Sequence, residues 1–176
     1  MDSLQHLSPY RIRDYLAKGW LTHDGMWFFN ALNTLGIETA NALNRAAIRS
    51  MASMEMQRTM AILGITPQDL GAFPDLADFM IRALDMVLPA SILKHYHATM
   101  LPPNIFRWEW EPGECFAYKG IKLAGCIDRY SCGVIYRIGC WLDALGIEHR
   151  IEPNPDTCMM HEKGYCHGDI IVNLPG

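Results

Sequence analysis

The sequence has few charged residues and no excess of positive charge. Charged side chains make up 19% of its 176 residues, and the formal net charge is −4. Nucleic acids and anionic membranes select proteins that present a basic face, so this balance argues against both as partners. We therefore expect a protein that binds neither nucleic acid nor membrane.

Long apolar segments are also missing, although half of the residues are hydrophobic. No run approaches the roughly 20 apolar residues that cross a bilayer. The first residues, Met1 to Gln5, lack the basic and apolar regions of a signal peptide. We expect a cytoplasmic protein that folds as one domain over residues 1–176, with its six cysteines as thiols or ligands rather than disulfides.

Two periodicities divide the chain into a helical half, residues 1–103, and an α+β half, residues 104–176. In the first half, the helical spacing of apolar residues and the turn and capping residues predict helices over 9–20, 22–35, 38–63 and 76–88, with Thr22 as the cap of the second. Thr66 and Pro67 predict a short helical turn before the last of these.

Strand patterns begin in the second half. Residues 105–111 alternate strictly between apolar and charged, and Pro112-Gly113 predicts a hairpin with a return strand over 114–118. A helix over 131–145 and strands over 147–152 and 166–173 follow. The fold class is therefore α+β, with the helical half packed on an antiparallel sheet and one long helix between strands.

Tryptophan and methionine are abundant, with 5 and 11 copies. Both supply large, adaptable apolar walls, and the methionines of the third predicted helix are better explained as wall residues than as copper ligands. We predict a pocket for an aromatic or hydrocarbon-like molecule between the helices and the sheet. The predicted pocket residues are Trp27, Met51, Met54, Phe106, Trp108 and Trp110.

His23 is the candidate catalytic residue. Neighbouring residues on a helix project about 100° apart, so His23 and Asp24 do not form a dyad by default. One interpretation is a helix start, with Thr22 as cap and Asp24 favoured by the helix dipole. The other places His23 in the pocket as general base or ligand contact. Because His23 lies between Trp20 and Trp27, we expect it to face inward and Asp24 to face outward.

Cys132, Cys158 and Cys166 form a candidate soft-metal site. Cys132 lies near the start of a predicted helix, and the other two flank a short excursion between strands. Three thiolates need one more donor to complete a zinc tetrahedron. The candidates for that donor are Asp156, His161, His167 and a water molecule. Two alternatives are inert buried thiols and an iron–sulfur cluster completed by Cys126 or Cys140.

The cysteine pattern resembles the C-terminal half of 4-vinyl reductase-type domains. The shared features are Cys158-x7-Cys166, the alternating apolar residues that follow, and the upstream Cys132. Such domains are small-molecule-binding α+β modules, and in related phenol sensors two cysteines at this spacing join a third and a glutamate around a structural zinc. The resemblance implies that these three cysteines bind zinc. The family's glutamate falls at Pro155 here, with Asp156 as the nearest replacement.

The segment from Trp20 to Phe28, WLTHDGMWF, resembles the opening motif of uncharacterised small bacterial and archaeal proteins. Some of their relatives are described as L-2-amino-thiazoline-4-carboxylic acid hydrolases, which implies ring opening by activated water.

Our leading hypothesis is a small-molecule-binding protein with a structural zinc or other soft-metal site. The alternatives are a metal-dependent hydrolase of a small heterocyclic or amide substrate and a protein-interaction subunit. A metal site closed by four protein ligands would indicate a structural role. A site with one coordination position open to water would indicate a catalytic role. A homodimer is compatible with each of these readings.

Overall fold

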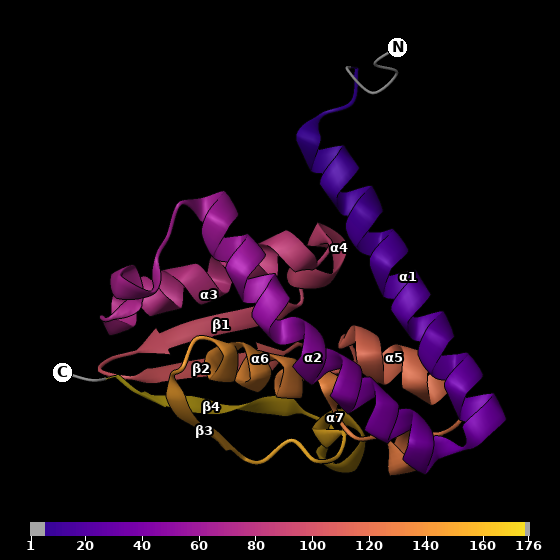
Figure 1. Cartoon of the computed structure of the whole chain (residues 1–176). Coiled ribbons are helices and arrows are strands. Elements are labelled where there is room, and N and C mark those ends of the chain that lie inside the picture. The colour runs from indigo at the N-terminus through magenta and orange to yellow at the C-terminus, as the bar shows by residue number, and fades with distance from the viewer. Residues whose placement is uncertain (1–5, 175–176) are drawn as a thin grey trace.

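The computed structural model describes residues 6–174, in which helices dominate the first half and the second half contributes most of a four-stranded antiparallel sheet. The predicted α+β class is confirmed. The first strand begins at Tyr96, inside the half expected to be helical. In Figure 1 the second long helix runs diagonally across the body of the protein, and the first long helix stands to its right. No helix among these residues is long and apolar enough to cross a membrane.

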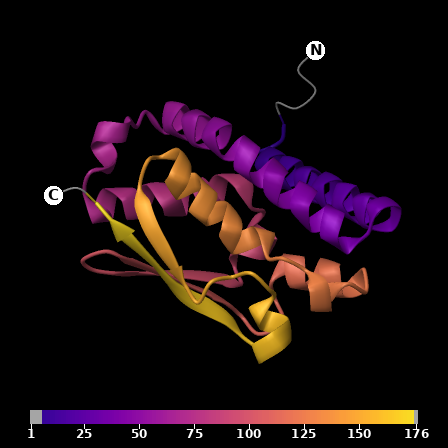
Figure 2. The ribbon, with the colours of Figure 1, turned by 60° about the horizontal axis from the view of Figure 1, so that its bottom comes forward.

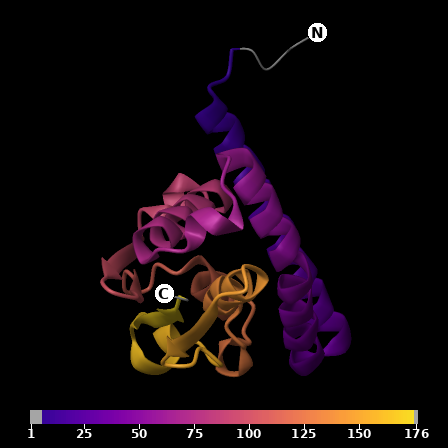
Figure 3. The same ribbon diagram turned by 60° about the vertical axis from the view of Figure 1, so that its left-hand side comes forward.

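Two long antiparallel helices form an N-terminal hairpin, α1 (Pro9–Leu35) and α2 (Ile37–Leu63), which stands at one side of the molecule in Figure 3. Ser8 caps α1 by accepting a hydrogen bond from the Arg11 amide at 3.3 Å. The predicted break at Thr22 is wrong, because α1 is continuous there. The Thr22 hydroxyl instead donates to the Lys18 carbonyl at 2.9 Å, a bond available to threonine inside a helix.

The end of α2 and the next turn follow the sequence signals. Gly64 has φ 67°, the left-handed conformation that closes many helices. Thr66 and Asp69 form the capping box of the short 3₁₀ helix η1 (Pro67–Leu70). Helix α3 (Phe73–Val87) starts three residues earlier than predicted. The short α4 (Ala90–Leu93) leads into the sheet.

The sheet has the strand order β1-β2-β4-β3, with all neighbours antiparallel. Its strands are β1 (Tyr96–Leu101), β2 (Ile105–Trp110), β3 (Glu148–Glu152) and β4 (Cys166–Asn173). The predicted return strand over 114–118 is wrong, because β1 and β4 already occupy both edges of β2. The chain enters helix α5 (Phe116–Leu123) there instead.

Helix α6 (Gly133–Ala144) contacts both α2 and β3 and forms the centre of the fold, as Figure 2 shows. The 3₁₀ helix η2 (Ile127–Arg129) precedes it, and α7 (Met159–Lys163) connects β3 to β4. Trp108, Trp110 and Trp141 are almost fully buried. Trp108 lies so close to Gly168 of β4 that a Cβ at that position would overlap its ring.

Candidate functional site

A cavity of about 610 Å³ lies between the N-terminal hairpin and the rest of the protein. Its walls come from α1, α2, the end of α3, the first two strands, α5 and α6. Apolar side chains dominate these walls. The aromatic ones are Trp20, Phe28, Phe29, Tyr96, Trp110, Phe116, Tyr130 and Trp141.

One stripe of α1 forms the cavity wall on the hairpin side. Trp20, Asp24 and Phe28 are four residues apart, so they project from the same face of the helix. His23 is turned about 100° from Asp24, is exposed, and is not among the cavity residues. The expectation that His23 faces inward is therefore wrong, whereas Asp24 is exposed, as expected, and also borders the cavity. Because Trp20 faces the cavity, Asp24, which lies about one helical turn later on the same face of α1, also borders it.

The predicted pocket residues divide into two groups. Met51 and Trp110 line the cavity. Trp27 and Met54 do not, and about half of the surface of each is exposed. Phe106 and Trp108 belong to the core instead, where Phe106 packs against Phe73 with ring centroids 4.9 Å apart. The part of the wall that comes from α5 was not predicted, because a strand was expected over residues 114–118 and no helix between it and residue 131.

Charged groups are rare in this cavity, and Arg137 of α6 is its only basic lining residue among those described. Its guanidinium forms two hydrogen bonds with the Glu55 carboxylate of α2, and Trp141 donates its indole hydrogen to Glu55 at 2.7 Å. The Arg137 and Glu55 side chains are only 17% and 16% exposed. The positive charge of Arg137 is thus balanced within the protein.

Asp24 is the other charged side chain of the wall. Within residues 6–174, its carboxylate forms no ion pair or hydrogen bond with another side chain or backbone group. Apolar surroundings withdraw water from the carboxylate and raise its pKa, an effect that the nearby Arg137 partly opposes. The Asp24 side chain is nevertheless exposed, so it lies at the rim where the cavity meets the surface.

The three predicted metal-binding cysteines come from different elements. Cys132 directly precedes α6, Cys158 directly precedes α7, and Cys166 begins β4. Burial raises the pKa of the Cys166 thiol to about 12, and the nearby Cys132 and Cys158 thiols add to that rise. The three thiols are therefore close enough to influence one another. Cys115, directly before α5, joins them, since its pKa rises to about 12 through burial and through Cys132 and Cys166.

The predicted candidates for a fourth ligand are engaged elsewhere. Asp156 accepts a hydrogen bond from Asn154 at 2.7 Å. The His161 Nε2 lies 2.7 Å from the Asp128 carboxylate, and the His167 ring stacks on Tyr165. Throughout residues 6–174, no three histidine, cysteine, aspartate or glutamate side chains are placed so that they could hold one metal ion. The four thiols lie in the same region of the protein, but their sulfur atoms do not surround a common centre.

The N-terminal part of the chain matches the model of a known protein family. Residues 8–99 match the model of a family described as a family of unknown function (DUF6125), and this match spans just over half of the sequence. The chain belongs to this family. The DUF6125 segment supplies α1, α2 and α3, and thus Trp20, Asp24 and Met51 of the cavity wall. No curated protein and no solved structure matches the chain.

Proposed function

We propose that this protein binds a small molecule with an aromatic or hydrocarbon body in the cavity between the α1–α2 hairpin and helices α5 and α6. The observation that carries the proposal is the cavity itself. Its volume of about 610 Å³ falls within the range of small-molecule sites, and its walls are mainly aromatic and aliphatic. An apolar molecule of two or three rings would remove those walls from water.

The cavity also has an entrance. Trp20, Met26 and Leu123 line it and are 41%, 55% and 91% exposed, so its wall is open to solvent between α1 and α5. Large exposed apolar side chains concentrated at one place commonly mark a binding site. A ligand can therefore enter without unfolding the core around Trp141.

Two neighbouring alanines of α2 provide a matched test. Both are exposed, but Ala47 lines the cavity and Ala46 does not. The probe is 2-naphthol, followed through tryptophan fluorescence. Ala47→Phe should weaken its binding at least tenfold by filling the space, while Ala46→Phe should leave it within twofold of the unchanged protein. Equal effects of the two substitutions, or no binding by the unchanged protein, would refute the proposal.

We further propose a structural role for the four neighbouring thiols, as ligands of one zinc ion. Their number supports this, since four cysteine thiolates complete a closed tetrahedral zinc site. Cys115 then takes the place for which Asp156, His161 and His167 were considered. Because the sulfur atoms do not converge as placed, binding would require their side chains to turn toward a common centre.

A further inference from the structure

Asp24 has an unusual position for a carboxylate. It lies on the cavity face of α1, four residues from both Trp20 and Phe28, and the described chain supplies it with no ion pair or hydrogen bond. The Asp24 side chain is exposed at the rim of the cavity, where water solvates its carboxylate. A ligand that provides a positive charge or a donor at this point would take the place of the water that it displaces.

The basic side chain of the cavity wall does not serve as a partner for Asp24. Arg137 lines the same cavity, but its guanidinium is held by Glu55, which also accepts the Trp141 indole hydrogen. Asp24 and Glu55 are acidic and Arg137 is basic, so these three side chains carry one more formal negative charge than positive. The polar end of the cavity therefore attracts a cation and repels an anion.

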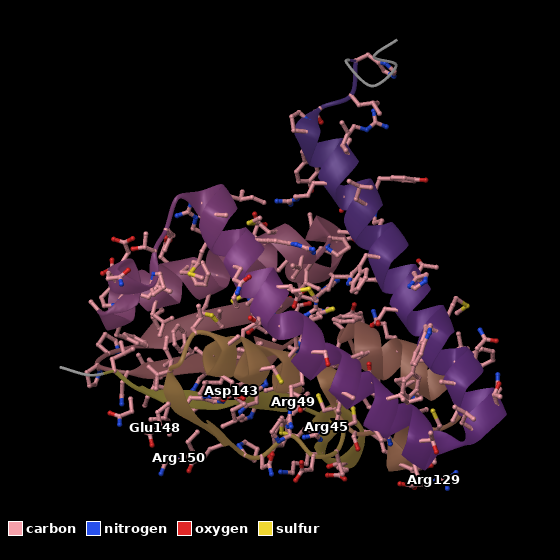
Figure 4. All side chains as sticks on the ribbon, in the orientation of Figure 1. Arg45, Arg49, Arg129, Asp143, Glu148 and Arg150 are labelled. Atoms are coloured by element: carbon pink, nitrogen blue, oxygen red, sulfur yellow. The ribbon has the colours of Figure 1, made fainter. Side chains whose placement is uncertain are left out.

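Other arginines of α2 are also engaged outside the cavity wall. The Arg45 guanidinium lies 4.0 Å from the centre of the Tyr136 ring, and Arg49 Nε donates to the Tyr136 hydroxyl at 3.0 Å. Figure 4 labels both arginines on the side of α2 toward α6 and β3. Neither is among the cavity residues.

The aromatic walls favour a cation as well. Trp20 and Trp110 border the cavity, and the faces of indole rings attract ammonium groups. The Trp141 ring is already engaged by Arg137, whose guanidinium lies 5.6 Å from the ring centre. The same rings also accommodate the apolar part of a ligand. A carboxylate beside aromatic rings thus suits a molecule that combines an apolar body with an ammonium group.

We infer that the ligand of this cavity is an apolar amine, and that Asp24 binds its ammonium group. This inference rests on the proposed small-molecule function and adds the chemical class of the ligand. The ammonium donates a charge-assisted hydrogen bond to the Asp24 carboxylate, while the hydrocarbon part occupies the space between the aromatic walls. A carboxylic acid of the same shape is excluded, because it would meet Asp24 and find Arg137 already paired.

Three probes of one shape separate these possibilities: 2-naphthylmethylamine, 2-naphthylmethanol and 2-naphthoic acid. With the unchanged protein at pH 7, calorimetry should show the amine binding about tenfold or more tightly than the alcohol, in line with a hydrogen bond to a charged group. The acid should bind most weakly. Asp24→Asn should weaken amine binding about tenfold and leave alcohol binding within twofold.

Glu109→Gln is the matched control, because it removes one negative charge from an exposed position on β2 that does not line the cavity. It should change neither affinity. Equal binding of amine and alcohol to the unchanged protein, or equal losses of both in Asp24→Asn, would overturn the inference and leave the cavity function standing. If none of the three probes binds the unchanged protein, the cavity function fails and the inference fails with it.

Discussion

Trp141 donates its indole hydrogen to the Glu55 carboxylate at 2.7 Å and so connects α6 to α2. Arg137, one turn earlier on α6, pairs with the same carboxylate. Glu55 is therefore the common acceptor of two α6 side chains that also form part of the cavity wall. The cavity wall and the contact between the two helices therefore share Arg137 and Trp141.

Replacing Glu55 by glutamine should destabilise the fold strongly. The substitution keeps an acceptor for Trp141 but leaves the charge of the largely buried Arg137 without a partner. Breaking such a pair on one side costs on the order of 3 kcal/mol in the free energy of unfolding. Urea unfolding followed by circular dichroism measures this change.

The matched control is Asp78→Asn, which breaks the exposed pair between Asp78 and Arg82 on α3. Its cost should stay within about 0.5 kcal/mol, as for most exposed pairs. Similar losses in both variants would show that Glu55 is no more than a surface residue.

Gly168→Ala should lower stability through a clash in the sheet. The added Cβ would overlap the Trp108 ring and lie 2.5 Å from the Glu152 carbonyl oxygen on the neighbouring strand. Overpacking of this kind costs about 1–3 kcal/mol or more. In contrast, Gly19→Ala in the middle of α1 meets no atom within 4 Å and should raise stability by up to about 1 kcal/mol. Chemical denaturation of the two variants checks the opposite signs.

Local signals in the sequence were sufficient for several element boundaries. The last strand, Cys166–Asn173, was predicted at its observed limits, because its buried residues alternate strictly. The end of α2 followed from Gly64. The prediction at Thr22 was wrong because a threonine hydroxyl can do either of two things. It can cap the start of a helix, or it can donate to a carbonyl of the preceding turn inside a helix, as Thr22 does here. Only the packing of α1 as a whole decides between these two states.

The residues of the candidate site were harder to predict from the sequence than the fold was. Trp108 and Trp110 share one face of β2, yet only Trp110 borders the cavity, because Gly168 receives the Trp108 ring. The segment after Pro112 becomes α5 through the long-range pairing of β2 with β4, which no local pattern reports. The helix phase of Trp20 was the signal that could have placed Asp24, rather than His23, in the cavity.

Asp24→Asn should raise the melting temperature slightly at pH 7. The pKa of Asp24 is raised in the folded state, so the folded protein holds a proton here more tightly than the unfolded chain. Stability is therefore lost as the pH rises from the unfolded pKa of 3.8 through the folded pKa, and the uncharged amide avoids this loss. Melting curves from pH 3 to 7 should show the gain at pH 7 and its disappearance near pH 3.

The charged groups near Asp24 are His23 on its own helix, Glu55 of α2 and Arg137 of α6. None is altered by the substitution, so a gain of equal size at pH 3 and pH 7 would assign the effect to something other than the Asp24 charge.

Protein purified without any metal-affinity step should contain about one zinc ion per chain if the four thiols bind it. Cys115→Ser and Cys166→Ser should each remove the metal and lower the melting temperature, because metal binding contributes directly to folding. Cys140→Ser is the control, since Cys140 lies within α6 and outside this group of thiols. Elemental analysis that finds no zinc, or equal retention in all three variants, contradicts the zinc proposal.

The most direct test of the central claim is a crystal structure of the protein with a brominated naphthylmethylamine, located by the anomalous signal of bromine. The account predicts one bromine peak inside the cavity bordered by Trp20, Tyr130 and Trp141, with the amine nitrogen within hydrogen-bonding distance of the Asp24 carboxylate. A peak only at the outer surface, or crystals soaked to saturation without any bromine peak, would contradict it.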